Sequence, residues 1–134
     1  MNGKPFLDTN IIVYAFALDD SRSEKAEALL AAGGIISVQV LNEFVNVSRQ
    51  KSRRSWEEIE AALSVLKELL APPQPITFEV HEAALRIARD YGYHFYDCLI
   101  IASALRANCS LLYSEDLRHG HTIDGLTIHN PFSD

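Results

Sequence analysis

Four acidic residues stand at the ends or beginnings of the elements that the sequence predicts: Asp8, Glu43, Asp97 and Asp116. Asp8 is the most informative, because it directly follows the apolar run Phe6-Leu7. An unpaired charge beside a buried strand is costly, so such a carboxylate usually has a hydrogen-bonding partner or a metal ion. Four carboxylates brought together from distant parts of the chain predict a divalent-cation site, since Mg²⁺ and Mn²⁺ prefer oxygen ligands.

Three of the four acids have a simpler explanation when each is considered alone. Asp97 would complement the dipole at the start of a helix. Glu43 would suit a solvated helix face, and Asp116 would suit a turn. Only Asp8 favours a functional role by itself, and the joint pattern of the four acids carries the prediction of a site.

The elements that must position these acids have clear start and stop signals. Two segments have the form of a capping box, in which a Ser and a Glu three residues later bond to each other's backbone. Pairs of glycine and proline then mark helix ends at 33–34 and 72–73. We expect helices to start at the boxes 21–24 and 55–58, to follow Ile35-Ile36, and to cover about 79–91 and 96–108.

Short apolar runs lie between these helices and have the continuous pattern of strands covered on both faces. They span residues 5–7, 34–37, 75–77, 110–113 and 126–129. Strands that alternate with helices predict an α/β fold with a parallel, doubly wound sheet. The carboxyl ends of such strands form one edge, where ligands bind. The four acids are expected at that edge.

Composition sets the broad class of the protein. The chain has 134 residues, of which 48% are hydrophobic and 22% charged, so we expect one globular domain over residues 1–134. No apolar run approaches the roughly 18 residues of a membrane helix, and the N-terminal residues do not form a signal peptide. We therefore expect a cytoplasmic protein without membrane association, in which Cys98 and Cys109 are reduced, small apolar side chains.

The net charge of −6 argues against binding of nucleic acid by the whole surface. It does not exclude a nuclease, because four of the negative charges belong to the predicted metal site. One dense basic segment contains Arg49, Lys51, Arg53 and Arg54. Two interpretations stay open for it: contacts to phosphate groups at the rim of the acidic site, or a solvated loop.

The acids occur within four short motifs that have a recognisable order. They are Phe6-Leu7-Asp8-Thr9-Asn10, Val40-Leu41-Asn42-Glu43-Phe44, the segment from Tyr96 to Ala104, and the segment from Leu111 to Leu117. In these motifs the chain resembles PIN-domain nucleases over about Phe6 to Pro131. Its compact length resembles the VapC-type toxin ribonucleases of type II toxin–antitoxin modules.

The resemblance implies a three-layer α/β/α fold with a short, mostly parallel five-stranded sheet in the order 3-2-1-4-5. It also implies an endoribonuclease that depends on Mg²⁺ or Mn²⁺, a cognate antitoxin and a homodimer. The four acids Asp8, Glu43, Asp97 and Asp116 would be the catalytic residues, and Asp8, Asp97 and Asp116 would hold the metal. Asn10 and Ser114 would hydrogen-bond the ligands or bound water. Whether Asp116 or its neighbour Glu115 lies nearer the metal is left open, and Asp116 is favoured.

An apolar stripe at helical spacing also has two interpretations. It consists of Trp56, Ile59, Leu63, Leu66 and Leu70, and it is either core or a partner groove. By resemblance, an antitoxin would cover apolar residues near the site. The candidates for that surface are Ile12, Phe16, Phe44, Val47, Trp56 and Ile59.

Other classes of function fit the sequence less well. A haloacid-dehalogenase-type phosphohydrolase needs a second Asp where this chain has Asn10, and a phospho-receiver domain needs a late Lys, although none follows Lys67. A dinucleotide-binding domain would have a glycine-rich turn after its first strand. His119 and His121 lack the further ligand of a zinc site. A PIN-like module that binds RNA or protein without cleavage stays open.

Overall fold

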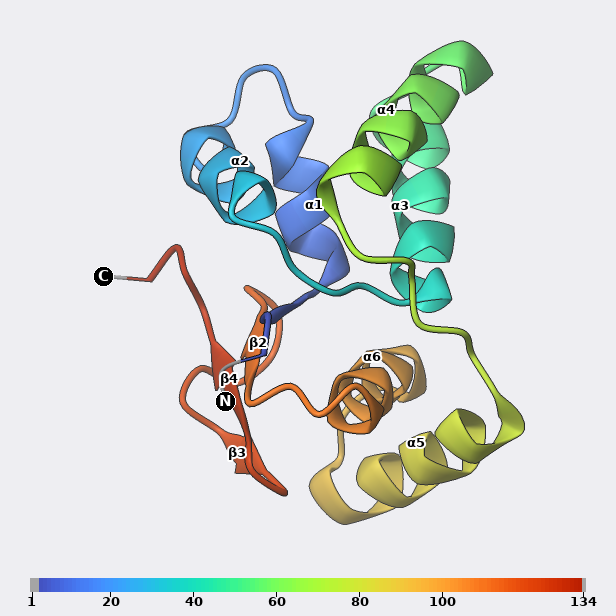
Figure 1. Ribbon diagram of the computed structural model, residues 1–134, viewed down its shortest axis with the longest axis vertical. Coiled ribbons are helices and arrows are strands. Elements are labelled where there is room, and N and C mark those ends of the chain that lie inside the picture. Colours follow the sequence, from blue (N-terminus) through green and yellow to red (C-terminus); the bar gives the residue numbers. More distant parts are fainter. Residues whose placement is uncertain (1–2, 134) are drawn as a thin grey trace.

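The computed structural model describes residues 3–133 and shows a short sheet flanked by helices (Figure 1). The helices are α1 (Thr9–Ala15), α2 (Ser23–Ala31), α3 (Val38–Gln50), α4 (Trp56–Leu69), α5 (Phe78–Tyr91) and α6 (Phe95–Arg106), and the strands are β1 (Phe6–Leu7), β2 (Leu111–Tyr113), β3 (Thr122–Ile123) and β4 (Leu126–His129). In Figure 1, α1 to α4 fill the upper half, and α5 and α6 lie at the lower right. The predicted α/β class is confirmed.

The sheet has the strand order β1-β2-β4-β3. β1 pairs with β2 in parallel, with Phe6 opposite Leu112, and β2 pairs in parallel with β4. β3 is antiparallel to β4, and the two are joined by Asp124 and Gly125. Both of these residues have positive φ, 47° and 88°, as a tight two-residue hairpin turn requires.

The strand count differs from the expected five. The segments 34–37 and 74–77 supply only isolated parallel bridges, Phe6 to Ile35 and Ser37 to Gln74, although these bridges follow the predicted neighbour order. Ser37 caps α3, so the chain turns into a helix directly after its bridge. Pro75 has no N–H to donate to a ladder. β3 was not expected and supplies the fourth strand.

One of the two predicted capping boxes forms. At α4 the Ser55 N–H donates to Glu58 Oε1 at 2.7 Å, and the Glu58 N–H donates to Ser55 Oγ at 3.1 Å. The box predicted at 21–24 is wrong, because α2 begins at Ser23 without a side-chain cap. The Ser23 hydroxyl instead donates to the carbonyls of Tyr14 and Ala17, and so ties α2 to the end of α1.

The core is made by the strands and by α6. Every residue of α6 from Cys98 to Ala104 is buried, as expected for a helix that is apolar on all sides. Cys98 and Cys109 are free and buried, as predicted. α5 packs against α6 and ends at Gly92, whose φ of 77° places it in the left-handed region. No helix in the described part of the chain combines the length and apolar character needed to span a membrane.

The apolar stripe on α4 is mainly core. Ile59, Leu66 and Leu70 are buried, whereas Trp56 is 56% exposed. The surface expected to face an antitoxin is wrong in part, because Ile12 and Phe44 are buried as well as Ile59. These three side chains pack inward and cannot contribute to a surface.

Gly34 lies in a close approach between the bridge segment and β1. A Cβ at this position would meet Leu7 Cδ1 and Cγ at 3.0 Å and the Pro5 carbonyl oxygen at 3.1 Å. Because Leu7 is fully buried next to Asp8, it has little room to shift. We expect Gly34→Ala to lower the free energy of unfolding by about 1–3 kcal/mol in urea titrations. Gly3→Ala, in open space, serves as the matched control and should change it by less than about 0.5 kcal/mol. Equal effects of the two substitutions would contradict this account.

Candidate active site

Asp8 connects β1 to α1 and is only 3% exposed. It is the N-cap of α1, and its Oδ1 accepts a hydrogen bond from the Thr9 N–H at 2.7 Å. Its Oδ2 accepts from Ser114 Oγ at 2.7 Å and from Asn10 Nδ2 at 3.4 Å. The carboxylate is therefore held from both the start of α1 and the segment after β2.

Burial raises the pKa of Asp8 from 3.8 to about 7. The hydrogen bonds from Ser114 and Thr9 oppose this shift, and the negative charges of Asp97 and Glu43 add to it. Three of the four predicted acids thus act on one another electrostatically, although they are far apart in the sequence. The structure brings them into one region of the molecule.

Asn10 links Asp8 to the segment after β2. Its Nδ2 donates to Asp116 Oδ2 at 3.1 Å as well as to Asp8, and its Oδ1 accepts from the Glu115 N–H at 3.2 Å. Ser114 Oγ also accepts from the backbone N–H of Asp116 at 3.2 Å. Asp8 and Asp116 are therefore joined through the two polar side chains that the sequence predicted to support them.

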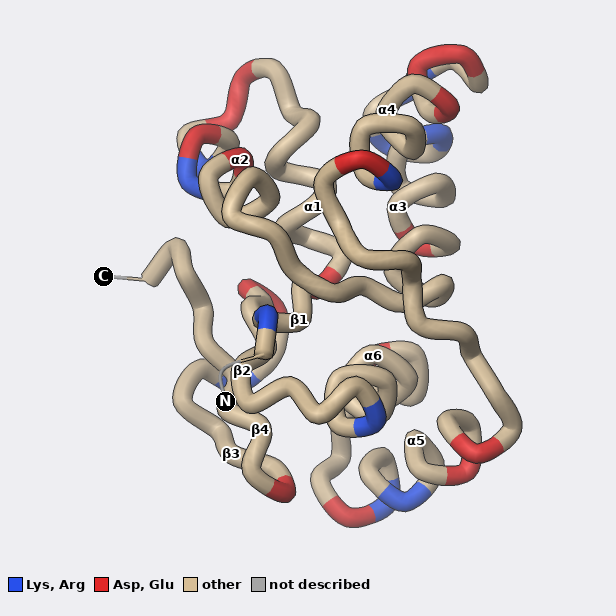
Figure 2. Tube along the Cα trace, viewed as in Figure 1, with Lys and Arg blue, Asp and Glu red and all other residues tan. Residues whose placement is uncertain are grey.

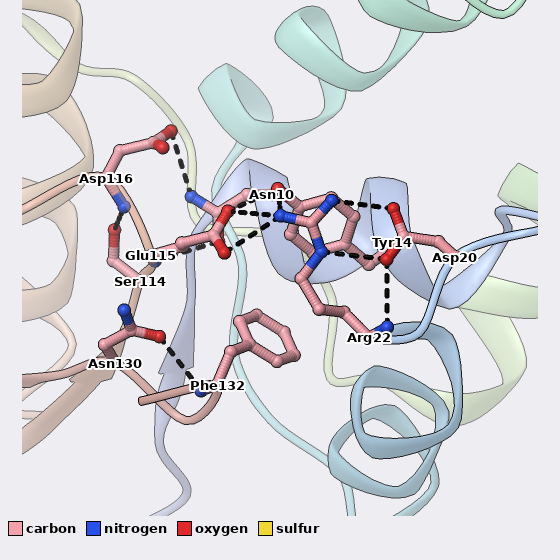
Figure 3. A network of polar contacts seen from close by, with 9 residues as sticks. All are labelled: Asn10, Tyr14, Asp20, Arg22, Ser114, Glu115, Asp116, Asn130 and Phe132. Carbon is pink, nitrogen blue, oxygen red and sulfur yellow. Dashed lines mark hydrogen bonds and ion pairs between the residues drawn. The ribbon is translucent and has the colours of Figure 1, made fainter. Parts of the chain in front are cut away.

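Glu115 faces a different direction from Asp116 (Figure 3). Its carboxylate accepts hydrogen bonds from Arg22 at 3.0 and 3.1 Å and from the Tyr14 hydroxyl. Arg22 also pairs with Asp20 at 2.7 Å and lies over the Tyr14 ring, 3.8 Å from its centroid. Glu115 is therefore an anchor to α1 and α2, and Asp116 is the acid that shares Asn10 with Asp8.

Glu43 and Asp97 reach the site from α3 and α6. Glu43 Oε1 accepts from Thr9 Oγ1 at 2.7 Å, and its Oε2 accepts from Gln39 Nε2 at 3.0 Å. Asp97 lies in the first turn of α6 and is partly buried. Burial raises the pKa of Asp97, and the charges of Glu43 and Asp116 raise it further. Figure 2 shows acidic segments at the ends of β1 and β2 and on α3, around the middle of the molecule.

A pocket of about 450 Å³ opens beside these acids. Its lining combines acidic, amide, aromatic and apolar side chains with one lysine: Thr9, Asn10, Val13, Tyr14, Glu43, Asn46, Val47, Lys51, Tyr96 and Asp116. Residues from α1, α3, α6 and the segment after β2 thus share one cavity. The pocket is large enough for a small organic ligand.

The donor set suits a hard, hydrated cation. Within residues 3–133, no three His, Cys, Asp or Glu side chains lie close enough together to enclose a metal ion as they stand. Mg²⁺ keeps several water ligands and is commonly held by only one or two carboxylates, so it needs no closed protein cage. Oxygen-only donors beside an open pocket fit such an ion, and the assignment of Asp8, Asp97 and Asp116 as ligands stays a prediction.

The four residues of the predicted basic segment have different surroundings. Arg49 lies over the Trp56 ring at 4.2 Å and donates to the Arg54 carbonyl at 3.0 Å, while Arg54 donates to the Phe16 carbonyl. These two arginines hold the connection between α3 and α4. Lys51 instead lines the acidic pocket. Arg53 lies in the same connection with a positive φ of 54°.

The histidine pair takes part in local packing. His119 Nδ1 accepts from the Asn130 N–H at 2.9 Å, and His121 Nδ1 hydrogen-bonds the Tyr93 hydroxyl at 2.6 Å. Sequence reasoning missed several pocket and network residues: Thr9, Tyr14, Arg22, Asn46 and Tyr96. Thr9 and Tyr96 adjoin motif acids and could have been included on that ground, whereas Arg22 has no local signal.

Comparison with known families identifies the fold. The family model of the PIN domain matches residues 6–123. The chain belongs to the PIN domain family. No curated protein matches it in sequence.

Solved structures share the PIN fold with this chain at low sequence identity. VapC20 from Mycobacterium tuberculosis, described as a sarcin-ricin loop cleaving toxin, has a TM-score of 0.69 at 20% identity over 83% of this chain and 90% of that one. A toxin–antitoxin complex from Klebsiella pneumoniae has a TM-score of 0.72 at 21% identity, over 97% of this chain and 99% of that one. VapBC2 from Rickettsia felis, bound to a promoter DNA fragment, has a TM-score of 0.66 at 23% identity, over 93% of this chain and 96% of that one.

The raised pKa of Asp8 has a direct consequence for the stability of this PIN domain. Asp8 binds a proton more tightly in the folded state than in the unfolded chain. Its contribution to the free energy of unfolding is therefore greatest below about pH 4 and is lost as the pH rises through about 7. In EDTA, wild type should lose stability relative to Asp8→Asn by at most about 1.4 kcal/mol per pH unit. Urea titrations of both proteins from pH 4.5 to 8.5 measure this difference. A difference that did not change with pH would contradict it.

Proposed function

We propose that this PIN domain is an endoribonuclease that depends on Mg²⁺ or Mn²⁺. The observation that carries the proposal is the buried Asp8 carboxylate, joined to Asp116 through Asn10 and influenced by the charges of Glu43 and Asp97. Acids with raised pKa values beside an open pocket are typical of a functional site. Their oxygen donors suit a hard divalent cation.

The residues have separate roles in this proposal. Asp8, Asp97 and Asp116 would hold the cation, which when bound would activate a water molecule and stabilise negative charge on the phosphate. Asn10 and Ser114 keep Asp8 and Asp116 in fixed orientations through the hydrogen bonds that they donate. Thr9 and Gln39 orient the Glu43 carboxylate at the pocket wall.

We further propose that the protein acts as the toxin of a toxin–antitoxin pair, and that it binds an antitoxin protein and forms a homodimer. The support is the fold shared with VapC20 and with two toxin–antitoxin complexes over most of each chain. Co-expression with the product of an adjacent reading frame would test the antitoxin. The cytoplasmic location expected from the sequence is part of the same proposal.

Cleavage of RNA by purified protein tests the enzymatic proposal. We expect single-stranded RNA to be cleaved with Mg²⁺ or Mn²⁺ and to remain intact in EDTA. Asp8→Asn should lower the rate at least about a hundredfold, since loss even of a group that orients a metal ligand costs about 10- to 100-fold. Asp90→Asn, an exposed acid on α5, is the matched control and should cleave at the wild-type rate. Near-normal cleavage by Asp8→Asn would show that the activity comes from elsewhere.

Lys51 is expected to contact a phosphate group of the substrate, because it is the basic residue that lines the acidic pocket. Lys51→Ala should weaken RNA binding and reduce the slope of log affinity against log salt by about 0.7. Fluorescence anisotropy at several salt concentrations, with the Asp8→Asn variant as background, measures this slope. Lys67→Ala, an exposed lysine on α4, should leave the slope unchanged. An identical slope with and without Lys51 would remove it from the interface.

A further inference from the structure

Tyr96 is a large aromatic residue that does not pack in the core. It is 56% exposed, although it lies in the first turn of α6, a helix whose following residues are buried. It immediately precedes Asp97, and its ring lies 6.2 Å from that of His94 and 6.1 Å from that of Phe95. Neighbouring rings therefore support Tyr96, which is also one of the residues that line the pocket.

Several residues of the pocket lining carry no charge. Val13 and Val47 supply apolar surface, and Asn46 supplies an amide that can both donate and accept hydrogen bonds. Tyr96 and Tyr14 add aromatic surface, although the hydroxyl of Tyr14 is engaged by Glu115. Apolar and aromatic side chains together with the Asn46 amide suit a flat, hydrogen-bonding ring better than they suit a phosphate.

A nucleobase meets these requirements. Bases stack on aromatic side chains through their flat faces and present donors and acceptors at their edges. Asn46 can pair with such an edge, and Lys51 can contact the adjoining phosphate group. A base inside a double helix already stacks on its neighbours, so only an unpaired base could enter.

We propose that Tyr96 and Asn46 form a binding site for one unpaired base of the RNA, next to the phosphodiester bond that is cleaved. This inference rests on the proposed nuclease function and adds to it the form of the substrate at the site. Tyr96 stacks on the base and Asn46 contacts its edge. The acids Glu43 and Asp116 line the same pocket, so a base held by Tyr96 and Asn46 keeps the adjoining phosphate group close to them.

Two strands that differ only in their bases test the proposal. One is a 12-nucleotide single-stranded RNA of mixed sequence, and the other is an abasic ribose-phosphate strand of equal length, each labelled with fluorescein. Binding is measured by anisotropy with Asp8→Asn as background. Tyr96→Ala should weaken binding of the RNA about 5- to 100-fold and change binding of the abasic strand less than twofold. Tyr96→Trp should retain RNA binding, because it keeps the stacking surface.

Trp56→Ala is the matched control, because Trp56 is equally exposed but lies outside the pocket. Its RNA-to-abasic affinity ratio should equal that of the background protein. An equal loss for both strands in Tyr96→Ala would overturn the base site. So would unchanged RNA binding together with an altered mass in light scattering, which would assign Tyr96 to a protein interface.

Kinetics separate this inference from the nuclease proposal. With Asp8 intact and Mg²⁺ present, Tyr96→Ala should raise KM by about the same factor as it weakens binding, with a smaller change in kcat. If wild type cleaves RNA and Tyr96→Ala has the same KM, the base site is wrong and the nuclease stands. If wild type neither binds nor cleaves RNA, both proposals are wrong.

Discussion

The buried carboxylate of Asp8 is the constraint on which the rest of the site depends. A charge with 3% exposure is unfavourable unless donors surround it, and burial accordingly raises its pKa to about 7. The first donor, the Thr9 N–H, is available because Asp8 caps α1, where helix polarity also favours a negative charge. The second, Ser114 Oγ, lies after β2, which pairs directly with β1. The β1–β2 pairing therefore determines whether Asp8 can be buried at all.

The same hydrogen bonds position the other acids. Asn10 connects Asp8 with Asp116 and with the backbone of Glu115, so it ties the start of α1 to the segment after β2. Arg22 then holds the Glu115 side chain against α1 and α2 (Figure 3). The adjacent acids Glu115 and Asp116 consequently have different roles. Arg22 neutralises the charge of Glu115, whereas Asp116 lines the pocket. The local geometry at Asp116 thus depends on the contact between Arg22 and Glu115, which are 93 residues apart in the sequence.

Sequence patterns predicted those features that depend on neighbouring residues. The α/β class and the capping box at Ser55 follow from local signals, and both are present. The Asp124-Gly125 turn signal was overlooked, although it is typical of the hairpin that contains β3. Two expected strands are reduced to single bridges for local reasons. Ser37 is the N-cap of α3, so the chain becomes helical there, and Pro75 has no N–H to donate to a neighbouring strand. The Arg22–Glu115 contact and the contacts of Arg49 with Trp56 and of Arg54 with Phe16 depend on tertiary packing, and no spacing rule reveals them.

Electrostatics limit how this site can recognise a polyanion. The chain carries a net charge of −6, and its pocket contains Glu43 and Asp116 but a single lysine. Without a bound cation, a phosphate group entering the pocket meets repulsion, so phosphate contacts alone supply little affinity. Stacking and amide contacts do not depend on net charge, and they act on the part of a nucleotide that carries none. A base-binding wall at Tyr96 and Asn46 would therefore let an acidic PIN domain bind RNA locally, while the rest of its surface repels it.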